Sequence, residues 1–281
     1  MIRYFPKHFK SNMILSIITP VYNCEKFVEE SLLSLCDQNF LFSTELILIN
    51  DGSTDNTWSV VEERCLPELK KSGLIRVKAF NSDIRLFLPT RRNQALKVSE
   101  GKYIAIHDGD DISLPGRFNK QVDFLSKNRN IFCVGGHARK IDCDSKPIGE
   151  MCYPPELHNR IMIELRGGKM NPIIDPTTMF GSGLIKQLGG YSLAPDKYTI
   201  PDFDLWLRAM SHGCRFHNLQ EFLVTYRVNL DGMTRKHNVV MQDQHKVSMN
   251  ELRNGECGMS KNNNWLNNTM ELMNEAVKCM E

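Results

Sequence analysis

The segment Ile14-Leu-Ser-Ile-Ile-Thr19 is a short run rich in β-branched residues, and it predicts a strand. The segment Glu25–Gln38 follows it and places apolar residues at helical spacing: Val28, Leu32, Leu35 and Cys36. A strand joined to a helix in this way is the repeating unit of sheets whose strands run parallel.

The same alternation continues along the chain. Further strands are predicted at Glu45–Asn50, Leu74–Phe80 and Lys102–His107. Further helices are predicted at Thr54–Cys65, Thr90–Ser99 and Pro115–Lys127. The alternation predicts an α/β fold of Rossmann-like type, in which a mostly parallel sheet is flanked by helices on both faces.

The pattern changes after about residue 130, where short strand candidates alternate with Gly and Pro. A helix is expected at Pro155–Arg166, and a second informative stretch runs from Tyr198 to Gly213. The tail at 238–281 is polar and compatible with helix. We therefore expect one domain at 1–237, with halves at 13–130 and 131–237, and a small C-terminal helical appendage at 238–281.

Charge and composition exclude several classes of protein. The 35 Lys and Arg nearly balance the 33 Asp and Glu, so no overall field attracts nucleic acid and no nucleic-acid partner is expected. The nine cysteines show no C-x-x-C pair, which favours reduced thiols. The apolar run Met13–Ile18 is too short to span a bilayer. These features predict a cytoplasmic protein and leave peripheral association with the inner face of a membrane open.

Three carboxylates follow the strand predicted at Lys102–His107: Asp108, Asp110 and Asp111. Ligands of open α/β sheets gather at the carboxyl ends of the strands, because loops and helix N-termini meet there. The three negative charges repel one another unless a cation neutralises them, and Mg²⁺ or Mn²⁺ prefers such oxygen ligands. The alternative is a plain turn that caps the helix beginning near Pro115.

Other polar segments belong to the same edge of the predicted sheet. Pro20-Val-Tyr-Asn23 adds an aromatic ring, and Asp51-Gly-Ser-Thr-Asp55 adds a carboxylate, although a capped turn also explains the second segment. Arg91-Arg-Asn93 could supply cations to phosphates or pair with the acidic loop, and a solvated helical face is the alternative.

The segment Pro201-Asp-Phe-Asp-Leu-Trp-Leu-Arg208 predicts a buried helix, with Pro at its start and acids in its first turn. Asp202 and Asp204 are two positions apart, so they face different directions. Only one of them can point into a common site. The alternative is that both merely stabilise the N-terminus of the helix.

In this order and spacing, the motifs closely resemble those of the family 2 inverting glycosyltransferases of the GT-A fold, from about Leu15 to Arg227. The matching pieces are Ser16-Ile-Ile-Thr-Pro-Val-Tyr-Asn23, Leu48-Ile-Asn-Asp-Gly-Ser-Thr-Asp55, Arg92-Asn93, Tyr103-Ile-Ala-Ile-His-Asp-Gly-Asp-Asp-Ile112 with Pro115, and Asp202-Phe-Asp-Leu-Trp-Leu-Arg208. The resemblance implies transfer of a sugar from a nucleotide diphosphate donor, first of all a UDP-sugar, to a hydroxyl of a glycan or lipid-linked acceptor. It implies an Mn²⁺ or Mg²⁺ cofactor, donor binding by residues 13–130 and acceptor binding by residues 131–237.

The resemblance also assigns roles to single residues. The residues that line the nucleotide pocket are Pro20, Tyr22 and Asn23. Asp51 then hydrogen-bonds the base, and Arg92 lies beside the base or the acidic loop. Asp108 contacts the ribose and takes part with Asp110 in binding the metal. Asp202 is the expected general base, with Asp204 in reserve.

The chain departs from the family pattern in two places. Pro201 stands where a Glu is common, and Leu86-Phe-Leu-Pro89 replaces a Gly-rich approach to the Arg-Asn pair. The segment Tyr226–His237 occupies the place of a closing loop. From there Arg227, Arg235 or His237 could reach the diphosphate or the metal, and each could equally be a surface residue.

Three other functions are alternatives to a glycosyltransferase. A phosphatase of the haloacid dehalogenase type carries its Asp pair after the first strand, whereas here the pair follows the fourth. A nucleotidyltransferase needs a Gly-rich phosphate loop near the N-terminus, which Pro20-Val-Tyr-Asn23 is not. The third rival is a catalytically degenerate relative that binds a nucleotide or glycan without turnover, and the two departures from the pattern are its support.

Overall fold

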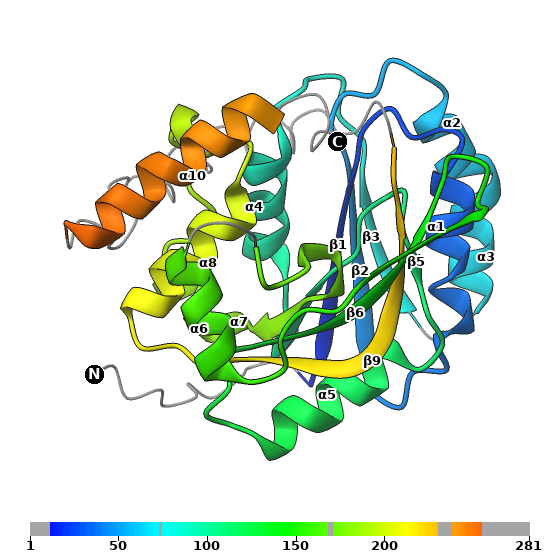
Figure 1. Cartoon of the computed structure of the whole chain (residues 1–281). Helices are drawn as coiled ribbons and strands as arrows, with labels where there is room; N and C mark the ends of the chain where they lie inside the picture. Colours follow the sequence, from blue (N-terminus) through cyan, green and yellow to red (C-terminus); the bar gives the residue numbers. More distant parts are fainter. Residues whose placement is uncertain (1–11, 73–74, 168–170, 230–237, 255–281) are drawn as a thin grey trace.

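The computed structural model describes residues 12–72, 75–167, 171–229 and 238–254. Its centre is a nine-stranded sheet in the order β3-β2-β1-β4-β8-β6-β9-β5, with β7 paired to β6 (Figure 1). The strands are β1 (Leu15–Val21), β2 (Thr44–Asn50), β3 (Ile75–Phe80), β4 (Tyr103–Ile106), β5 (Ile112–Ser113), β6 (Cys133–Ile141), β7 (Pro147–Cys152), β8 (Met179–Gly181) and β9 (Phe216–Arg227).

The first four strands run parallel, as the sequence predicts, and they end at the same edge of the sheet. Val21 at the end of β1 lies beside Asn50 at the end of β2. The backbone N–H of Asp51 donates to the carbonyl of Val21 over 2.9 Å, and that of His107 donates to Ile18 over 3.1 Å. The loops that follow β1, β2 and β4 therefore leave the sheet together.

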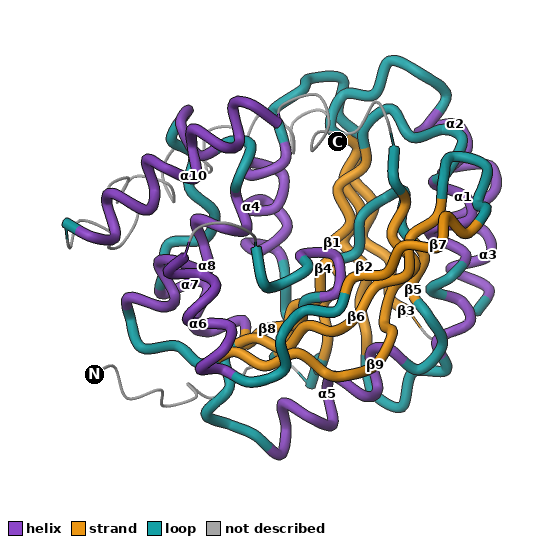
Figure 2. Tube along the Cα trace, viewed as in Figure 1, coloured by secondary structure: helices purple, strands orange, loops and turns teal. Residues whose placement is uncertain are grey.

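The second half of the chain extends this sheet and curls it (Figure 2). β8 pairs antiparallel with both β4 and β6, whereas β6 and β9 run parallel to each other. The two-residue strand β5, directly after the acidic loop, pairs antiparallel with the end of β9, with Ile112 opposite Thr225. The far end of β9 is thereby brought back to the loop that follows β4.

Helices cover both faces of the sheet, because neighbouring residues of each strand point to opposite sides. Ile17 joins a core beneath one set of helices, and Ile18 joins the core on the other face. The first set is α1 (Val28–Leu33), α2 (Thr57–Val60), α3 (Leu66–Lys71) and α5 (Arg117–Lys127). The second set is α4 (Leu88–Val98), α6 (His158–Gly167), α7 (Ser182–Gln187), α8 (Pro201–Ser211) and α10 (Asn238–Arg253).

Helix α8 is held by an aromatic cluster. Trp206 is fully buried and meets the rings of Phe132, Phe180 and Phe216 edge-on, with centroid distances from 6.0 to 6.5 Å. Each such pair adds about 0.5–1.5 kcal/mol to the free energy of burial. The start of α8, which carries Asp202, is consequently fixed against the sheet.

Two predicted helices are interrupted. The helix expected at Glu25–Gln38 consists of α1 and the short 3₁₀ turn η1 (Cys36–Gln38). The helix expected at Thr54–Cys65 begins as α2 and widens into a π-turn, η2 (Val61–Cys65), before α3. Pro67 in the first turn of α3 has no N–H to donate to the preceding turn, which accounts for the irregular bonding there.

Part of the C-terminal tail is helical, as expected, because α10 packs against α8 and buries Met249 in the shared core. Lys197 at the end of the 3₁₀ turn η4 (Pro195–Lys197) donates to Ser248 of α10 over 2.7 Å. Residues 255–281 lie outside the described part, and the domain boundary at 237/238 stays a prediction. Among the described helices, none is long and apolar enough to cross a membrane.

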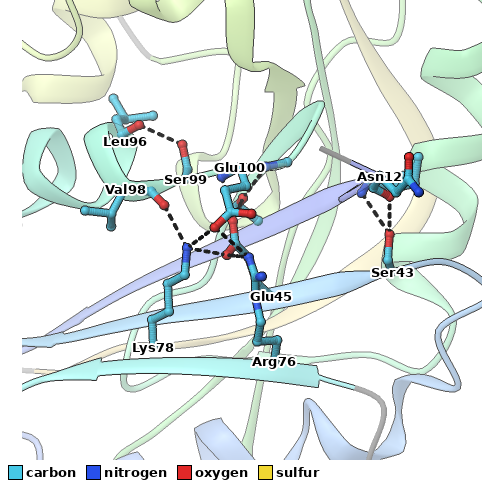
Figure 3. A network of polar contacts seen from close by, with 12 residues as sticks. Asn12, Ser43, Glu45, Arg76, Lys78, Leu96, Val98, Ser99 and Glu100 are labelled. Carbon is cyan, nitrogen blue, oxygen red and sulfur yellow. Dashed lines mark hydrogen bonds and ion pairs between the residues drawn. The ribbon is translucent and has the colours of Figure 1, made fainter. Parts of the chain in front are cut away.

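An ion network around one buried carboxylate closes the opposite, amino end of the parallel strands (Figure 3). Glu45 on β2 is fully buried, and its carboxylate accepts from Ser16 Oγ over 2.6 Å and from the backbone N–H of Glu100 over 2.7 Å. Arg76 and Lys78 of β3 contact its other oxygen at 2.8 and 2.9 Å. Burial alone would raise the pKa of Glu45, but these hydrogen bonds lower it below its usual value.

Candidate active site

The loop after β2 is packed against the segment that precedes α4. Asp51 is buried, and its Oδ1 accepts from the backbone N–H of Leu86 and from Arg91 Nε, both over 2.7 Å. Gly52 has a φ of 69°, and a Cβ there would lie 2.7 Å from the backbone nitrogen of Arg85. The approach to α4 is thus fixed by Asp51, whose predicted role is to bind the base.

The loop after β1 is bound to the loop after β2. The side chain of Asn23 accepts from the backbone N–H of Thr54 over 2.8 Å, and the backbone N–H of Asn23 donates to Ser53 Oγ over 3.1 Å. Tyr22 is half-buried, and the guanidinium carbon of Arg85 lies 3.8 Å from the centre of its ring. Pro20, within β1, completes this group of predicted nucleotide-binding residues beside Asp51.

The acidic loop after β4 is shaped by the end of β9. Asp111 is buried and accepts from the backbone N–H of Arg227 over 2.8 Å, while Arg227 Nε donates to the carbonyl of Asp110 over 2.9 Å. The Arg227 guanidinium also pairs with Glu30 at 2.6 Å. Arg227 is therefore neither a surface residue nor a ligand reaching into the site. Arg235 and His237 lie outside the described residues.

Two carboxylates of this loop, Asp110 and Asp111, form no ion pair with a Lys, Arg or His side chain in the described part of the chain. Burial, and then the charge of Asp108, raises the pKa of Asp110 to about 7. Burial, followed by the charges of Asp110 and Asp108, also raises the pKa of Asp111 well above its usual value. This excess of negative charge fits a divalent cation held by Asp108 and Asp110. The described residues contain no group of three or more His, Cys, Asp or Glu side chains that could hold a metal.

A buried arginine connects this loop to the second half of the chain. Arg92 Nη2 lies 3.1 Å from Asp108 Oδ1 and 2.6 Å from Asp175 Oδ2. Two further nitrogens of Arg92, Nε and Nη1, are buried and have no hydrogen-bond partner. The Arg91-Arg-Asn93 segment is consequently not a solvated helical face. Of the two places expected for Arg92, the structure shows the one beside the acidic loop.

Asp175 is a member of this cluster that the sequence analysis missed. It opens the 3₁₀ turn η3 (Asp175–Thr177), just before β8, and only 13% of its side chain is exposed. Burial raises its pKa against the opposing effect of Arg92. Its only sequence signal was an acid preceding Pro176 in an otherwise apolar segment.

Asp202 and Asp204 have different surroundings, as their spacing predicts. Asp202 is half-buried, accepts from Asn171 Nδ2 over 2.6 Å, and has a pKa raised by burial. Asp204 accepts from Arg208 Nε over 2.8 Å. The burial of Asp204 and its ion pair with Arg208 favour Asp202 over Asp204 as the base. Asn171, which orients Asp202, carried no motif that could have identified it.

Comparison with known proteins gives concordant results. The sequence model described as Glycosyl transferase family 2 matches residues 16–188. EpsE of Bacillus subtilis, named as a glycosyltransferase, is 33% identical over 222 residues, which cover 79% of this chain and 76% of EpsE. WfaP of Escherichia coli, a UDP-Glc:α-D-GlcNAc-diphosphoundecaprenol β-1,3-glucosyltransferase, is 25% identical over 216 residues, covering 77% of this chain and 78% of WfaP.

A solved structure supports the fold. The mannosyltransferase PcManGT of Pyrobaculum calidifontis, in complex with GDP-Man and Mn²⁺, superposes with a TM-score of 0.61 at 18% identity. The match covers 87% of this chain and 66% of that one. The curled, mostly parallel sheet flanked by helices is the GT-A arrangement implied by the sequence motifs. The family match spans more than half of the chain and includes the loops at Tyr22, Asp51 and Asp108, so this protein belongs to glycosyl transferase family 2.

Proposed function

We propose that this protein is a metal-dependent, inverting glycosyltransferase. It takes a sugar from a nucleotide diphosphate donor, first of all a UDP-sugar, and passes it to a hydroxyl of a glycan or lipid-linked acceptor. One observation carries the proposal: Arg92 joins the poorly neutralised acidic loop, through Asp108, to Asp175 in the half that also bears Asp202. The relatives add support, since WfaP is named for a UDP-sugar donor and a lipid-linked acceptor.

The donor end of the site lies at the carboxyl edge of β1, β2 and β4. Tyr22, Asn23 and Asp51 flank the nucleotide there, and Asp108 and Asp110 hold the cation with Asp108 near the ribose. When bound, the cation neutralises charge that develops on the departing diphosphate. Fixed groups that stabilise this charge more strongly in the transition state than in the ground state accelerate the reaction. Mn²⁺ bound with GDP-Man in PcManGT is consistent with this arrangement.

The acceptor end centres on Asp202. Its carboxylate removes the proton of the acceptor hydroxyl while that oxygen bonds to the anomeric carbon. The bond from the anomeric carbon to the diphosphate oxygen breaks on the opposite face, so a single displacement inverts the configuration. Asn171 keeps one carboxylate oxygen of Asp202 in place through its 2.6 Å hydrogen bond. For an acceptor embedded in a lipid bilayer, the protein would work at the cytoplasmic surface of that membrane.

The surviving rival is a degenerate relative that binds nucleotide or glycan without turnover. The family match leaves no support for a phosphatase. The two remaining functions differ only in whether bound donor is consumed. Binding and turnover must therefore be measured separately.

Donor binding is tested by thermal unfolding with a panel of nucleotides and nucleotide sugars, in Mn²⁺, in Mg²⁺ and in EDTA. A ligand at one hundred times its Kd adds about 2.7 kcal/mol to the stability of the native state. We expect a shift with one nucleotide diphosphate that EDTA and Asp110→Asn abolish. Asp123→Asn is the control, because this acid lies on the exposed face of α5. A shift unaffected by EDTA would contradict the metal role.

Turnover is tested by release of nucleoside diphosphate from the donor so identified, with candidate acceptors added. Asp202→Asn should abolish release and leave donor affinity within about twofold. Turnover retained by this variant would refute Asp202 as the base. A wild-type protein that binds donor tightly but never consumes it would instead establish the degenerate binder.

A further inference from the structure

Phe87 has an unusual backbone conformation directly before α4. Its φ is 64° and its ψ 158°, a region that residues with a Cβ adopt only at a cost in free energy. Half of its side chain is exposed to solvent. Burial of the ring therefore recovers little of this cost, and packing alone does not explain why a large aromatic residue occupies a position suited to glycine.

The ring of Phe87 belongs to a row of stacked groups. It stacks on Tyr198, with ring centroids 5.9 Å apart and an angle of 30° between the planes. The guanidinium carbon of Arg85 lies 4.9 Å from the centre of the Phe87 ring and 3.8 Å from that of Tyr22. We name these four residues the aromatic row: Tyr22, Arg85, Phe87 and Tyr198.

The aromatic row runs from the donor end of the proposed site to its acceptor end. Tyr22 stands at the nucleotide-binding corner, and the backbone N–H of Leu86, beside Phe87, is bound by Asp51. At the other end, Tyr198 lies four residues before Asp202, the proposed base. The Phe87–Tyr198 pair is thus the part of the row nearest the segment that meets the acceptor.

We propose that Phe87 and Tyr198 form a platform that stacks against a sugar ring of the acceptor. One face of a pyranose carries mainly C–H groups, and an aromatic face binds it by apolar contact while the hydroxyls around the ring stay available for hydrogen bonds. Arg85 contacts the Phe87 ring and donates to the hydroxyl of Tyr22 over 3.0 Å, which holds the ring beside the donor end. This inference rests on the proposed function. It explains why a large aromatic residue is present at position 87 despite its strained backbone: the ring binds the acceptor.

The key variant is Phe87→Gly, because it removes the ring and relieves the backbone at once. We expect its melting temperature to equal or exceed that of the wild type, since glycine adopts this conformation freely. Phe87→Leu retains a Cβ and loses only the aromatic face, so it should weaken sugar binding without a gain in stability. Tyr153→Ala is the matched control, since Tyr153 is an exposed aromatic residue outside the row.

Binding is measured by saturation-transfer NMR with the methyl glycosides of glucose, galactose, mannose and N-acetylglucosamine, in the presence of UDP and Mn²⁺. The wild type and Tyr153→Ala should bind at least one glycoside. Phe87→Gly and Phe87→Leu should bind it about three- to tenfold more weakly, with UDP affinity in Mn²⁺ within twofold of the wild type.

Several outcomes would overturn the platform. They are a lowered melting temperature of Phe87→Gly, unchanged glycoside affinity in both Phe87 variants, or a wild type that binds UDP with Mn²⁺ and none of the glycosides. Failure of the proposed function gives a different result. If the protein binds no nucleotide but binds a glycoside in a Phe87-dependent way, the platform is supported and the proposed transferase function is contradicted.

Discussion

Arg92 and Asp175 form a buried ion pair, 2.6 Å long, between the first half of the chain and the second. The same guanidinium contacts Asp108 at 3.1 Å. One buried positive charge is thereby shared between the acidic loop after β4 and the turn before β8. Asp108 is thereby linked, through Arg92, to a residue of the opposite half of the domain.

We expect Asp175→Asn to lower the free energy of unfolding by about 3–5 kcal/mol, because it leaves Arg92 buried with incomplete compensation. Urea denaturation measures this loss. Asp123→Asn is the matched control, since its pair with Lys127 is exposed, and it should cost less than about 1 kcal/mol. Equal losses in the two variants would show that Asp175 does not stabilise Arg92.

Asn171→Ala tests how Asp202 is positioned. The 2.6 Å hydrogen bond fixes the carboxylate, and hydrogen bonds to charged groups contribute about 1.5–3 kcal/mol. We expect kcat to fall about ten- to one-hundredfold, with UDP affinity in Mn²⁺ unchanged, because Asn171 lies at the acceptor end. Steady-state kinetics and calorimetry separate the two quantities. A loss of UDP affinity with normal kcat would place Asn171 at the donor end instead.

Gly52→Ala tests the packing of the Asp51 loop. A Cβ at this position would lie 2.7 Å from the backbone nitrogen of Arg85, so the segment before α4 has to move. We expect a loss of at least about 2 kcal/mol in stability and weaker UDP binding. Gly116→Ala is the control, because Gly116 has a similar φ of 76° but no atom within 4 Å of the added Cβ.

Gly116→Ala should therefore cost only the conformational strain, about 1–2 kcal/mol, and leave UDP binding intact. Denaturation and calorimetry on both variants complete the comparison. If Gly52→Ala and Gly116→Ala lost the same stability and UDP affinity, the close approach of Gly52 to Arg85 would not contribute to either quantity.

Glu45→Gln tests the pH dependence of stability. The folded-state pKa of Glu45 is lowered, so its stabilisation is present above the unfolded-state pKa, about 4.3, and is lost as the pH falls through the folded-state value. We expect the variant to be less stable than the wild type at pH 7 and to approach it at pH 3. Denaturant titrations at both values measure the difference, and a constant gap would contradict the assignment.

The sequence predicted the parallel part of the fold because its signals are local. β1, β2 and β4 are short runs of apolar and β-branched residues, and the turn residues and acids after them mark where they end. The carboxyl ends of parallel strands meet at one edge, so the sequence alone predicts that Tyr22, Asp51 and Asp108 lie close together.

The rest of the site depends on contacts between distant parts of the chain. Asp175 and Asn171 lie in loops without periodic pattern, and their partners Arg92 and Asp202 are 83 and 31 positions away. Arg227 looked like part of a closing loop, yet it is buried against the acidic loop. Local propensity carries no information about such pairings. The antiparallel pairing of β8 with β4 brings the Asp175 turn toward the acidic loop, and that of β5 with β9 brings Arg227 to the same loop.

The contact between Arg227 and the acidic loop also sets an order of events during protein synthesis. The ribosome makes Asp110 117 residues before Arg227, whose side chain and backbone hold Asp110 and Asp111 in place. A nascent chain that has completed all four parallel strands still lacks the residue that gives this loop its shape. The acidic loop therefore takes its native shape late in translation, after β9 has emerged and folded back.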